Sequence, residues 1–227
     1  YTKQMAKRVK AAGMKLLLDF HYSDFWADPG KQFKPKAWEG LTPDQLKEAL
    51  YEYTRKVLLE LQAQGTTPDM VQIGNEINHG MVWPEGSVAN LSFLSELLRA
   101  GYAAVKTVDP KIVTMLHVAL GGQHDESVFF IDNMLARGVQ FDVIGESYYP
   151  KWHGTLADLN RNLNDLVKRY GKDVIVVEYS QEKEAVNKIA FELPDGKGKG
   201  TCIWEPLNTW ESIFNQDGKS NQLLELY

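Results

Sequence analysis

The sequence has little cysteine and no long apolar run. Cys202 is the single cysteine in 227 residues, which excludes an intrachain disulfide and a zinc site built on cysteines. No run reaches the roughly 18 apolar residues of a membrane-spanning helix, so no membrane partner is expected. The first 13 residues lack the apolar centre and cleavage site of a signal peptide. Their apolar spacing predicts a helix entered partway through, and we expect that something upstream is missing.

Charge of one sign is also lacking, because the net charge is −5 and the two signs are interspersed. A nucleic-acid partner is therefore not expected. The sequence has no glycine-rich phosphate turn, no GxSxG serine motif and no HExxH zinc motif. We expect no nucleotide or other cofactor and no catalytic serine.

Six short apolar runs organise the chain, with segments of helical period between them. Their hydrophobicity is continuous rather than alternating, which is typical of parallel strands buried on both faces. Alternating strands and helices fit a closed eight-stranded barrel or an open doubly wound sheet. Each run ends in a carboxylate, histidine or aromatic residue, which favours a (β/α)8-type TIM barrel truncated to about six parallel strands. We expect one catalytic domain over residues 1–227, with strands at 14–20, 69–75, 111–118, 141–149, 173–180 and 200–206.

Two carboxylates follow separate predicted strands. Glu76 comes after Asn75 in GNE, and Glu178 ends VIVVE. One protonated and one ionised carboxyl group suit the hydrolysis of a glycosidic bond. An isolated glutamate at a strand end more often caps a loop or pairs with a lysine, but the pair favours catalysis. Glu146 is a rival carboxylate or a buried structural group, and Glu205 either pairs with a buried cation or binds a sugar hydroxyl.

Aromatic residues gather in the predicted loops, and two histidines follow strands. Flat aromatic faces stack on the C–H faces of sugars, whereas Trp38 and Trp210 are expected to fill the core. His21 and His117 lack the spacing of a metal site and are better suited to bind sugar hydroxyls. The residues expected to stack on or line a sugar site are Trp26, Trp83, Tyr148, Tyr149, Trp152 and Trp204.

Five segments, found in order between residues 14 and 206, resemble glycoside hydrolase family 53, the endo-β-1,4-galactanases. The resemblance implies a retaining glycosidase on a (β/α)8 barrel that acts on galactan or arabinogalactan, in an extracellular or periplasmic location. The segments are LLLDFHYSDFWADPGKQ, VQIGNEINHGMVWPEG, VIGESYYPKWHG, VIVVEYS and IWEP.

The same resemblance assigns roles to residues. It makes Glu76 the general acid/base and Glu178 the nucleophile, and it places Asn75 on the 2-hydroxyl of the sugar at the cleavage point. Tyr148 or Tyr149 is implied to hydrogen-bond the nucleophile. The remaining residues implied to line the cleft are His21, Asp24, Trp26, Trp83, His117, Trp152 and Trp204.

Two departures from the family pattern affect these expectations. The chain begins in the helix after the family's second strand, so two strands are missing. The segment 180–200 is short and lacks a cage of oxygen ligands, so no metal is predicted. Missing strands expose backbone edges and apolar surface, which predicts a homo-oligomer covering the gap, a smaller closed barrel or a fragment. The first is favoured. A β-glycan hydrolase of relaxed specificity and a carbohydrate-binding remnant are the alternative functions.

Overall fold

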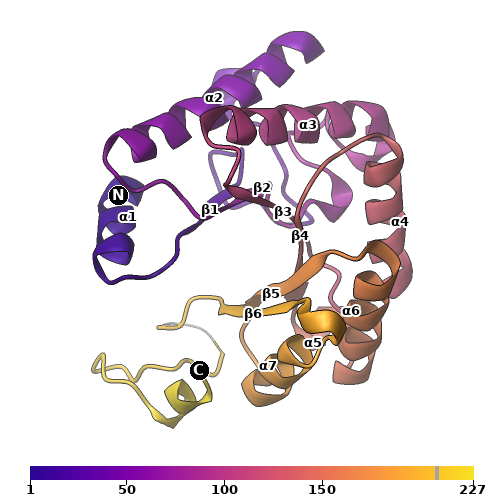
Figure 1. Ribbon diagram of the computed structural model, residues 1–227. Coiled ribbons are helices and arrows are strands. Elements are labelled where there is room, and N and C mark those ends of the chain that lie inside the picture. The colour runs from indigo at the N-terminus through magenta and orange to yellow at the C-terminus, as the bar shows by residue number, and fades with distance from the viewer. Residues whose placement is uncertain (208–209) are drawn as a thin grey trace. The chain divides into compact units, whose positions relative to one another are not determined.

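The structure, a computed structural model, describes residues 1–207 and 210–227. Within these ranges six strands follow one another in chain order in a six-stranded sheet (Figure 1). The first strand pairs in parallel with the second, the second with the third, the fourth with the fifth and the fifth with the sixth, which confirms the predicted α/β fold. The strands are β1 (Leu17–Phe20), β2 (Met70–Ile73), β3 (Val113–Val118), β4 (Val143–Tyr148), β5 (Asp173–Tyr179) and β6 (Gly198–Ile203).

The helices begin and end at residues whose side chains or backbone suit those positions. Thr42 and Thr155 form capping boxes with Gln45 and Asp158, and Gly171 ends its helix in a left-handed conformation. None of the described helices combines the length and hydropathy needed to cross a bilayer. Near the C-terminus, Gln222–Leu226 form a short 3₁₀ helix. The α-helices are α1 (Thr2–Ala11), α2 (Pro43–Ala63), α3 (Leu91–Val108), α4 (His124–Ala136), α5 (Pro150–His153), α6 (Leu156–Tyr170) and α7 (Lys183–Phe191).

The chain forms two compact units, and the first comprises residues 1–116 and 131–142. Helices α2 and α3 pack side by side in this unit (Figure 1). A Cβ atom on Gly101 of α3 would lie 2.7 Å from Ile73 Cγ2 and 3.5 Å from Leu50 Cδ2. Glycine at this position therefore permits α3 to approach both β2 and α2 closely.

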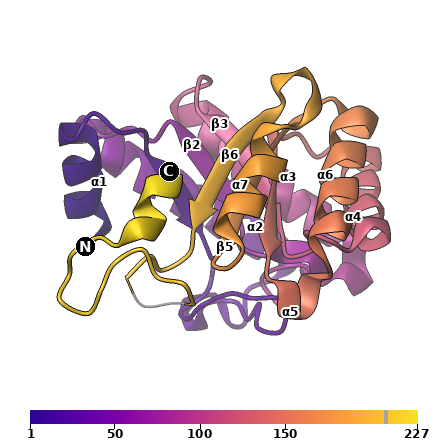
Figure 2. The ribbon, with the colours of Figure 1, turned by 90° about the horizontal axis from the view of Figure 1, so that it is seen from below.

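The second unit comprises residues 117–130 and 143–227. Helix α7 packs along β6 in this unit (Figure 2). The register of β4 and β5 shifts between Glu146 and Ser147, so that Glu146 lies opposite Val176 and Ser147 opposite Glu178. Irregularities of this kind redirect side chains near the ends of strands. This one brings Glu178 into register with the last residues of β4.

Candidate active site

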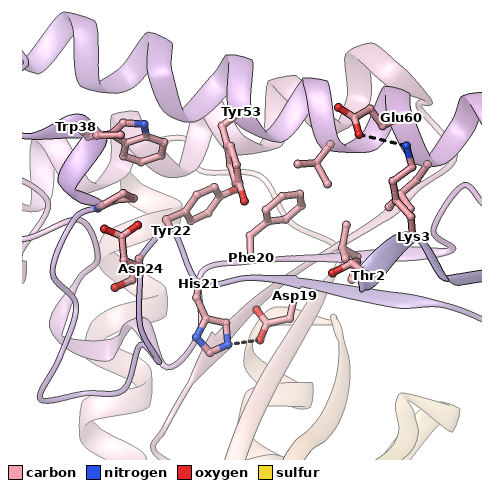
Figure 3. Close-up of a pocket in the computed structure, with 16 residues that line it drawn as sticks. Thr2, Lys3, Asp19, Phe20, His21, Tyr22, Asp24, Trp38, Tyr53 and Glu60 are labelled. Atoms are coloured by element: carbon pink, nitrogen blue, oxygen red, sulfur yellow. Dashed lines mark hydrogen bonds and ion pairs between the residues drawn. The ribbon is translucent and has the colours of Figure 1, made fainter. Parts of the chain in front are cut away.

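The predicted site residues fall into two clusters, one in each unit, and both follow the carboxyl ends of strands. In the first unit, His21 after β1 bonds through both ring nitrogens. Nε2 lies 3.0 Å from an oxygen of Asp19, and Nδ1 accepts a hydrogen bond of 2.9 Å from the Ala27 amide (Figure 3). Because Nδ1 is an acceptor, the proton of the neutral ring is on Nε2, where it is donated to the carboxylate.

Asn75 is held by the same network. Its Nδ2 donates to the Ala27 carbonyl over 2.8 Å, and its Oδ1 accepts from Gln72 Nε2 over 3.1 Å. Gln72 Nε2 also donates to Asp19 over 2.6 Å. The ring of contacts fixes which end of the Asn75 amide is the donor, so its orientation is set before any substrate arrives.

Glu76 follows in a left-handed backbone conformation, with φ 51° and ψ 52°, and is 7% exposed. Non-glycine residues rarely adopt this conformation, and such strain concentrates at functional sites. Gly74, two residues earlier, has φ 84°, and a Cβ there would lie 2.5 Å from Ile77 Cγ2. The sequence around GNE therefore produces a sharp turn at the end of β2, and the candidate acid sits on it.

A cavity of about 550 Å³ in the first unit lies largely apart from this network. It shares Asp19, His21 and Asp24 with the strand end, but most of its wall comes from α1, α2 and the loop between β1 and α2. Asp24 accepts a hydrogen bond of 2.8 Å from the Lys36 amide, so it orders its own loop. Figure 3 shows the aromatic part of the wall, formed by Phe20, Tyr22, Trp38 and Tyr53. Trp38 is 9% exposed, which confirms its predicted place in the core.

The loop after β1 presents exposed aromatic residues. Trp26 is 69% exposed and its neighbour Phe25 is 84% exposed. Trp83 meets Phe33 edge to face, with ring centroids 5.8 Å apart, and its Nε1 donates to the His79 carbonyl. Of the two predicted tryptophans, Trp26 is thus exposed and Trp83 is half-buried. Phe25 and Phe33 are also exposed and were not predicted.

In the second unit, Glu178 is half-buried and accepts a hydrogen bond of 2.8 Å from the Tyr149 hydroxyl. Of the two tyrosines considered from the sequence, Tyr149 makes this contact, whereas the Tyr148 hydroxyl donates to the Gly154 carbonyl. A donated hydrogen bond favours the ionised form of a carboxyl group. Tyr149 is thus placed to keep Glu178 charged.

Tyr149 is itself held by His153, which sequence reasoning missed. The Nδ1 of His153 accepts a hydrogen bond of 3.1 Å from the Tyr149 amide. Burial lowers the pKa of His153 to about 4, against which a backbone hydrogen bond at Ser147 acts weakly. His153 is therefore neutral near pH 7, as the acceptor role requires. The one signal in the sequence is its spacing of four residues from Tyr149 in YPKWH.

Two tryptophans flank Tyr149 in the second unit. The Trp152 and Trp210 rings each lie 6.0 Å from the Tyr149 ring and 6.0 Å from one another. They are 52% and 51% exposed, so the prediction that Trp210 fills the core is wrong. Trp204 directly follows β6, and its amide donates to the Tyr179 carbonyl. Trp152 and Trp210 thus present ring surface to solvent beside the buried Tyr149.

His117, at the end of β3, is 1% exposed and lies 2.7 Å from the Ser147 hydroxyl through Nε2. Ser147 is opposite Glu178 in the β4–β5 register. His117 is therefore placed to orient the polar groups beside Glu178, and its Nε2 already has a hydrogen-bond partner. Both histidines that the sequence singled out are thus built into hydrogen-bonded networks.

The rival carboxylate Glu146 is fully buried, with an exposed fraction of 0%. Its pKa is raised by burial and is lowered in part by Ser127 on α4, the Leu120 backbone and Asn162 on α6. These neighbours place the carboxyl group between the sheet and its helices, which fits the structural interpretation. Glu205, just after β6, has a left-handed backbone with φ 43°.

The sequence of the chain was compared with those of known protein families and proteins. The sequence profile of glycosyl hydrolase family 53 matches residues 1–190. A Niallia circulans protein, described as an uncharacterized protein in the bgaB 5' region, is 51% identical over 98% of this chain and 75% of its own length. A probable arabinogalactan endo-β-1,4-galactanase A of Neosartorya fischeri is 40% identical over 78% of this chain. The chain matches 52% of that enzyme, about half its length.

The fold agrees. The catalytic domain of an Ignisphaera aggregans family 53 protein superposes with a TM-score of 0.93 at 34% identity, over 99% of this chain and 76% of that domain. The (β/α)8-type fold predicted from the sequence, with six strands described, is thereby confirmed. The profile match covers most of the chain and includes both Glu76 and Glu178. This chain belongs to glycosyl hydrolase family 53.

Proposed function

We propose that the chain is a retaining endo-glycosidase that hydrolyses β-1,4-galactan. The observation that carries this proposal is the family 53 match over residues 1–190, supported by the Neosartorya fischeri relative named as an arabinogalactan endo-β-1,4-galactanase. The partner is then a polysaccharide, and the expected location is extracellular or periplasmic. Because β1 and β6 end the described sheet, association of a second copy along an open edge is part of the proposal.

The reaction proceeds in two displacements. An oxygen of Glu178 attacks the anomeric carbon while the bond to the leaving oxygen breaks, and Glu76 gives its proton to that oxygen. Water then loses a proton to Glu76 and attacks the same carbon, which releases Glu178. Two inversions leave the configuration unchanged. Retaining enzymes hold the two carboxyl groups about 5–5.5 Å apart, and we expect this separation in a crystal structure of the active protein.

The surroundings of the two glutamates support this division of roles. The Tyr149 hydroxyl donates to Glu178 over 2.8 Å, which suits a group that must be ionised to attack. Glu76 is 7% exposed and sits on the sharp turn after β2, which suits a carboxyl group held in one place for proton donation. The fixed amide of Asn75 is proposed to bind the 2-hydroxyl of the sugar at the cleavage point.

The proposed sugar-binding residues are aromatic and polar side chains that follow the carboxyl ends of strands. Exposed ring faces stack on galactose, and the histidines orient hydroxyl groups or the residues that bind them. Trp210 joins the set predicted from sequence because it lies beside Trp152 and Tyr149. The proposed substrate-binding residues are His21, Asp24, Trp26, Asn75, Trp83, His117, Tyr148, Tyr149, Trp152, Trp204 and Trp210.

Tyr149→Phe is expected to lower kcat on galactan by about 10- to 100-fold, because Glu178 loses a donor that favours its ionised form. The acid limb of the kcat/KM profile should move to higher pH, because more of the carboxyl group is then protonated. Tyr170→Phe is the matched control, since the Tyr170 hydroxyl donates to the Val128 carbonyl on the helix layer. Initial rates between pH 4 and 8 check this result. An unchanged acid limb in Tyr149→Phe would contradict the role of Tyr149.

Substrate specificity separates the proposal from its two alternatives. Release of reducing ends is measured on β-1,4-galactan, arabinogalactan, xylan and carboxymethylcellulose, and the anomer formed first is identified by NMR. Hydrolysis of the two galactans alone, with the β-anomer formed first, is the expected result. Comparable rates on xylan or carboxymethylcellulose would favour a hydrolase of relaxed specificity. Galactan binding with no hydrolysis of any polymer would favour a carbohydrate-binding remnant.

A further inference from the structure

Gln32, in the loop after β1, reaches the backbone of the candidate acid. Its Nε2 donates to the Asn75 carbonyl over 2.7 Å and to the Glu76 carbonyl over 3.1 Å. The residue is 1% exposed. We propose that Gln32 is a positioning residue that holds Glu76 in its left-handed backbone conformation and so aims its carboxyl group at the leaving oxygen. This inference rests on the proposed function, in which Glu76 is the acid/base.

The hydrogen bonds of Gln32 require the left-handed turn. In an extended strand, successive residues face opposite sides, and so do their carbonyl groups. A single amide nitrogen therefore reaches two consecutive carbonyls only where the chain has left the extended conformation. At Glu76, with φ 51° and ψ 52°, both carbonyls lie within reach of Nε2. The side chain thus favours a backbone conformation that a glutamate rarely adopts.

The backbone of Gln32 is itself fixed to the segment after Glu76. The Trp83 amide donates to the Gln32 carbonyl over 2.6 Å, and Phe33 bridges to Trp83. His79 Nδ1 lies 2.9 Å from the Pro29 carbonyl, and Lys34 pairs with Glu85. These contacts join residues 29–34 to residues 79–85. The amide of Gln32 therefore acts from a rigid loop and cannot readily follow Glu76 if the turn relaxes.

The Oε1 atom of the Gln32 amide indicates that folding stability alone does not account for a glutamine at this position. Its Oε1 is buried and has no hydrogen-bond partner among the residues that the structure describes. An unsatisfied buried acceptor is unfavourable for folding. Methionine, of similar shape, removes both that acceptor and the two donated hydrogen bonds. If Gln32 served folding stability alone, methionine would serve nearly as well at this position. If Gln32 positions Glu76, its two donated hydrogen bonds are required.

The leaving group of the substrate reveals whether Gln32 acts through the acid. The leaving group of galactan is a sugar hydroxyl, which needs proton donation. In a 2,4-dinitrophenyl β-galactobioside the leaving group is 2,4-dinitrophenolate, which departs without a proton. For Gln32→Met, kcat/KM on galactan is expected to fall about 100-fold with KM nearly unchanged, the effect of a small misplacement of a catalytic group. On the aryl substrate, kcat/KM should fall less than about threefold, because this constant reports the step that needs no acid.

Two further variants complete the test. Gln32→Glu is expected to recover part of its activity as the pH falls, because a protonated carboxyl group again donates one hydrogen bond while an ionised one repels the two carbonyls. This variant also serves if Gln32→Met fails to fold. Gln64→Met is the matched control, since Gln64 Nε2 donates to the Lys3 carbonyl over 3.0 Å at the far end of α2, and it should behave as the unchanged chain.

Equal losses on both substrates, or no loss on galactan, would overturn the inference. If the unchanged chain cleaves neither substrate, the proposed function fails and a crystal structure of Gln32→Met decides the inference separately. A Glu76 that has left its positive φ supports the positioning role. A Glu76 that keeps φ near 51° without the Gln32 donors contradicts it.

Discussion

Glu178→Ala is expected to abolish galactan hydrolysis, with kcat lowered by about 10⁵-fold, the scale seen when a nucleophile is removed from an enzyme that forms a covalent intermediate. Without the carboxylate, nothing attacks the anomeric carbon from within the protein. Galactan binding should persist, because the half-exposed rings of Trp152 and Trp210 remain available for stacking when the Glu178 side chain is removed. Reducing-end assays and calorimetric titration with galactotetraose measure the two effects.

Azide distinguishes the nucleophile from the acid/base. In Glu178→Ala, azide attacks the anomeric carbon from the face of the lost carboxylate, the leaving oxygen departs with a proton from Glu76, and an α-galactosyl azide forms by one inversion. In Glu76→Ala with an activated aryl substrate, Glu178 first forms the covalent intermediate. Azide then displaces Glu178, so that two inversions yield the β-galactosyl azide. NMR of the products assigns each role.

Glu184→Ala is the control for these variants, because Glu184 is an exposed carboxylate in the first turn of α7, six residues beyond Glu178. It should hydrolyse galactan at the unchanged rate. More than a tenth of the original kcat in Glu178→Ala, or a β-galactosyl azide from that variant, would contradict the assignment of Glu178 as nucleophile.

The strands and their polar ends could be predicted because each leaves a local pattern. A short apolar run with a carboxylate at or near its end marks both β2, three residues before Glu76, and β5, whose penultimate residue is Glu178. The choice between Tyr148 and Tyr149 could not be predicted from such a pattern. Adjacent residues point in opposite directions, and which one meets Glu178 depends on the register shift at Glu146, a property of two paired strands.

Gln32 and Trp210 show what else the sequence does not reveal. Gln32 is an uncharged loop residue whose partners lie 43 and 44 residues away on the backbone, where side-chain identity carries no signal. Trp210 has the hydrophobicity of a core residue, but it lies outside any periodic segment that would assign it a face. Trp210 lies instead beside Tyr149 and Trp152, and these contacts depend on the fold of the whole unit.

The stability of the folded chain is expected to depend on pH through Glu146. Burial raises the pKa of Glu146 from 4.5 to about 8, and neither of its oxygens has a hydrogen-bond partner among the described residues. The groups on the covering helices that oppose the shift are the uncharged side chains of Ser127 on α4 and Asn162 on α6. Burial is the largest cause of the shift, so it decides how Glu146 titrates.

The sign follows from proton linkage. Between pH 4.5 and about 8 the folded chain retains a proton on Glu146 that the unfolded chain has lost. Stability contributed by this group is therefore complete below pH 4.5 and falls as the pH rises to 8, by about 5 kcal/mol in total. His153 acts in the opposite direction, because its lowered pKa raises stability between pH 4 and 6.5. From pH 6.5 to 8 Glu146 acts without this opposition, and the free energy of unfolding should fall by about 2 kcal/mol.

Glu146→Gln keeps the shape of the side chain and removes its titration. Urea unfolding at pH 6.5, 7.25 and 8 should show no fall in this variant, which should exceed the unchanged chain in stability by a margin that grows with pH. Glu192→Gln, an exposed carboxyl group at the end of α7, should keep the original slope. Because Glu146 faces the helices, galactan hydrolysis by Glu146→Gln should be unchanged at pH 6.5. An inactive, folded variant would instead favour a catalytic role for Glu146, and an unchanged slope would show that the carboxyl group reaches water before it ionises.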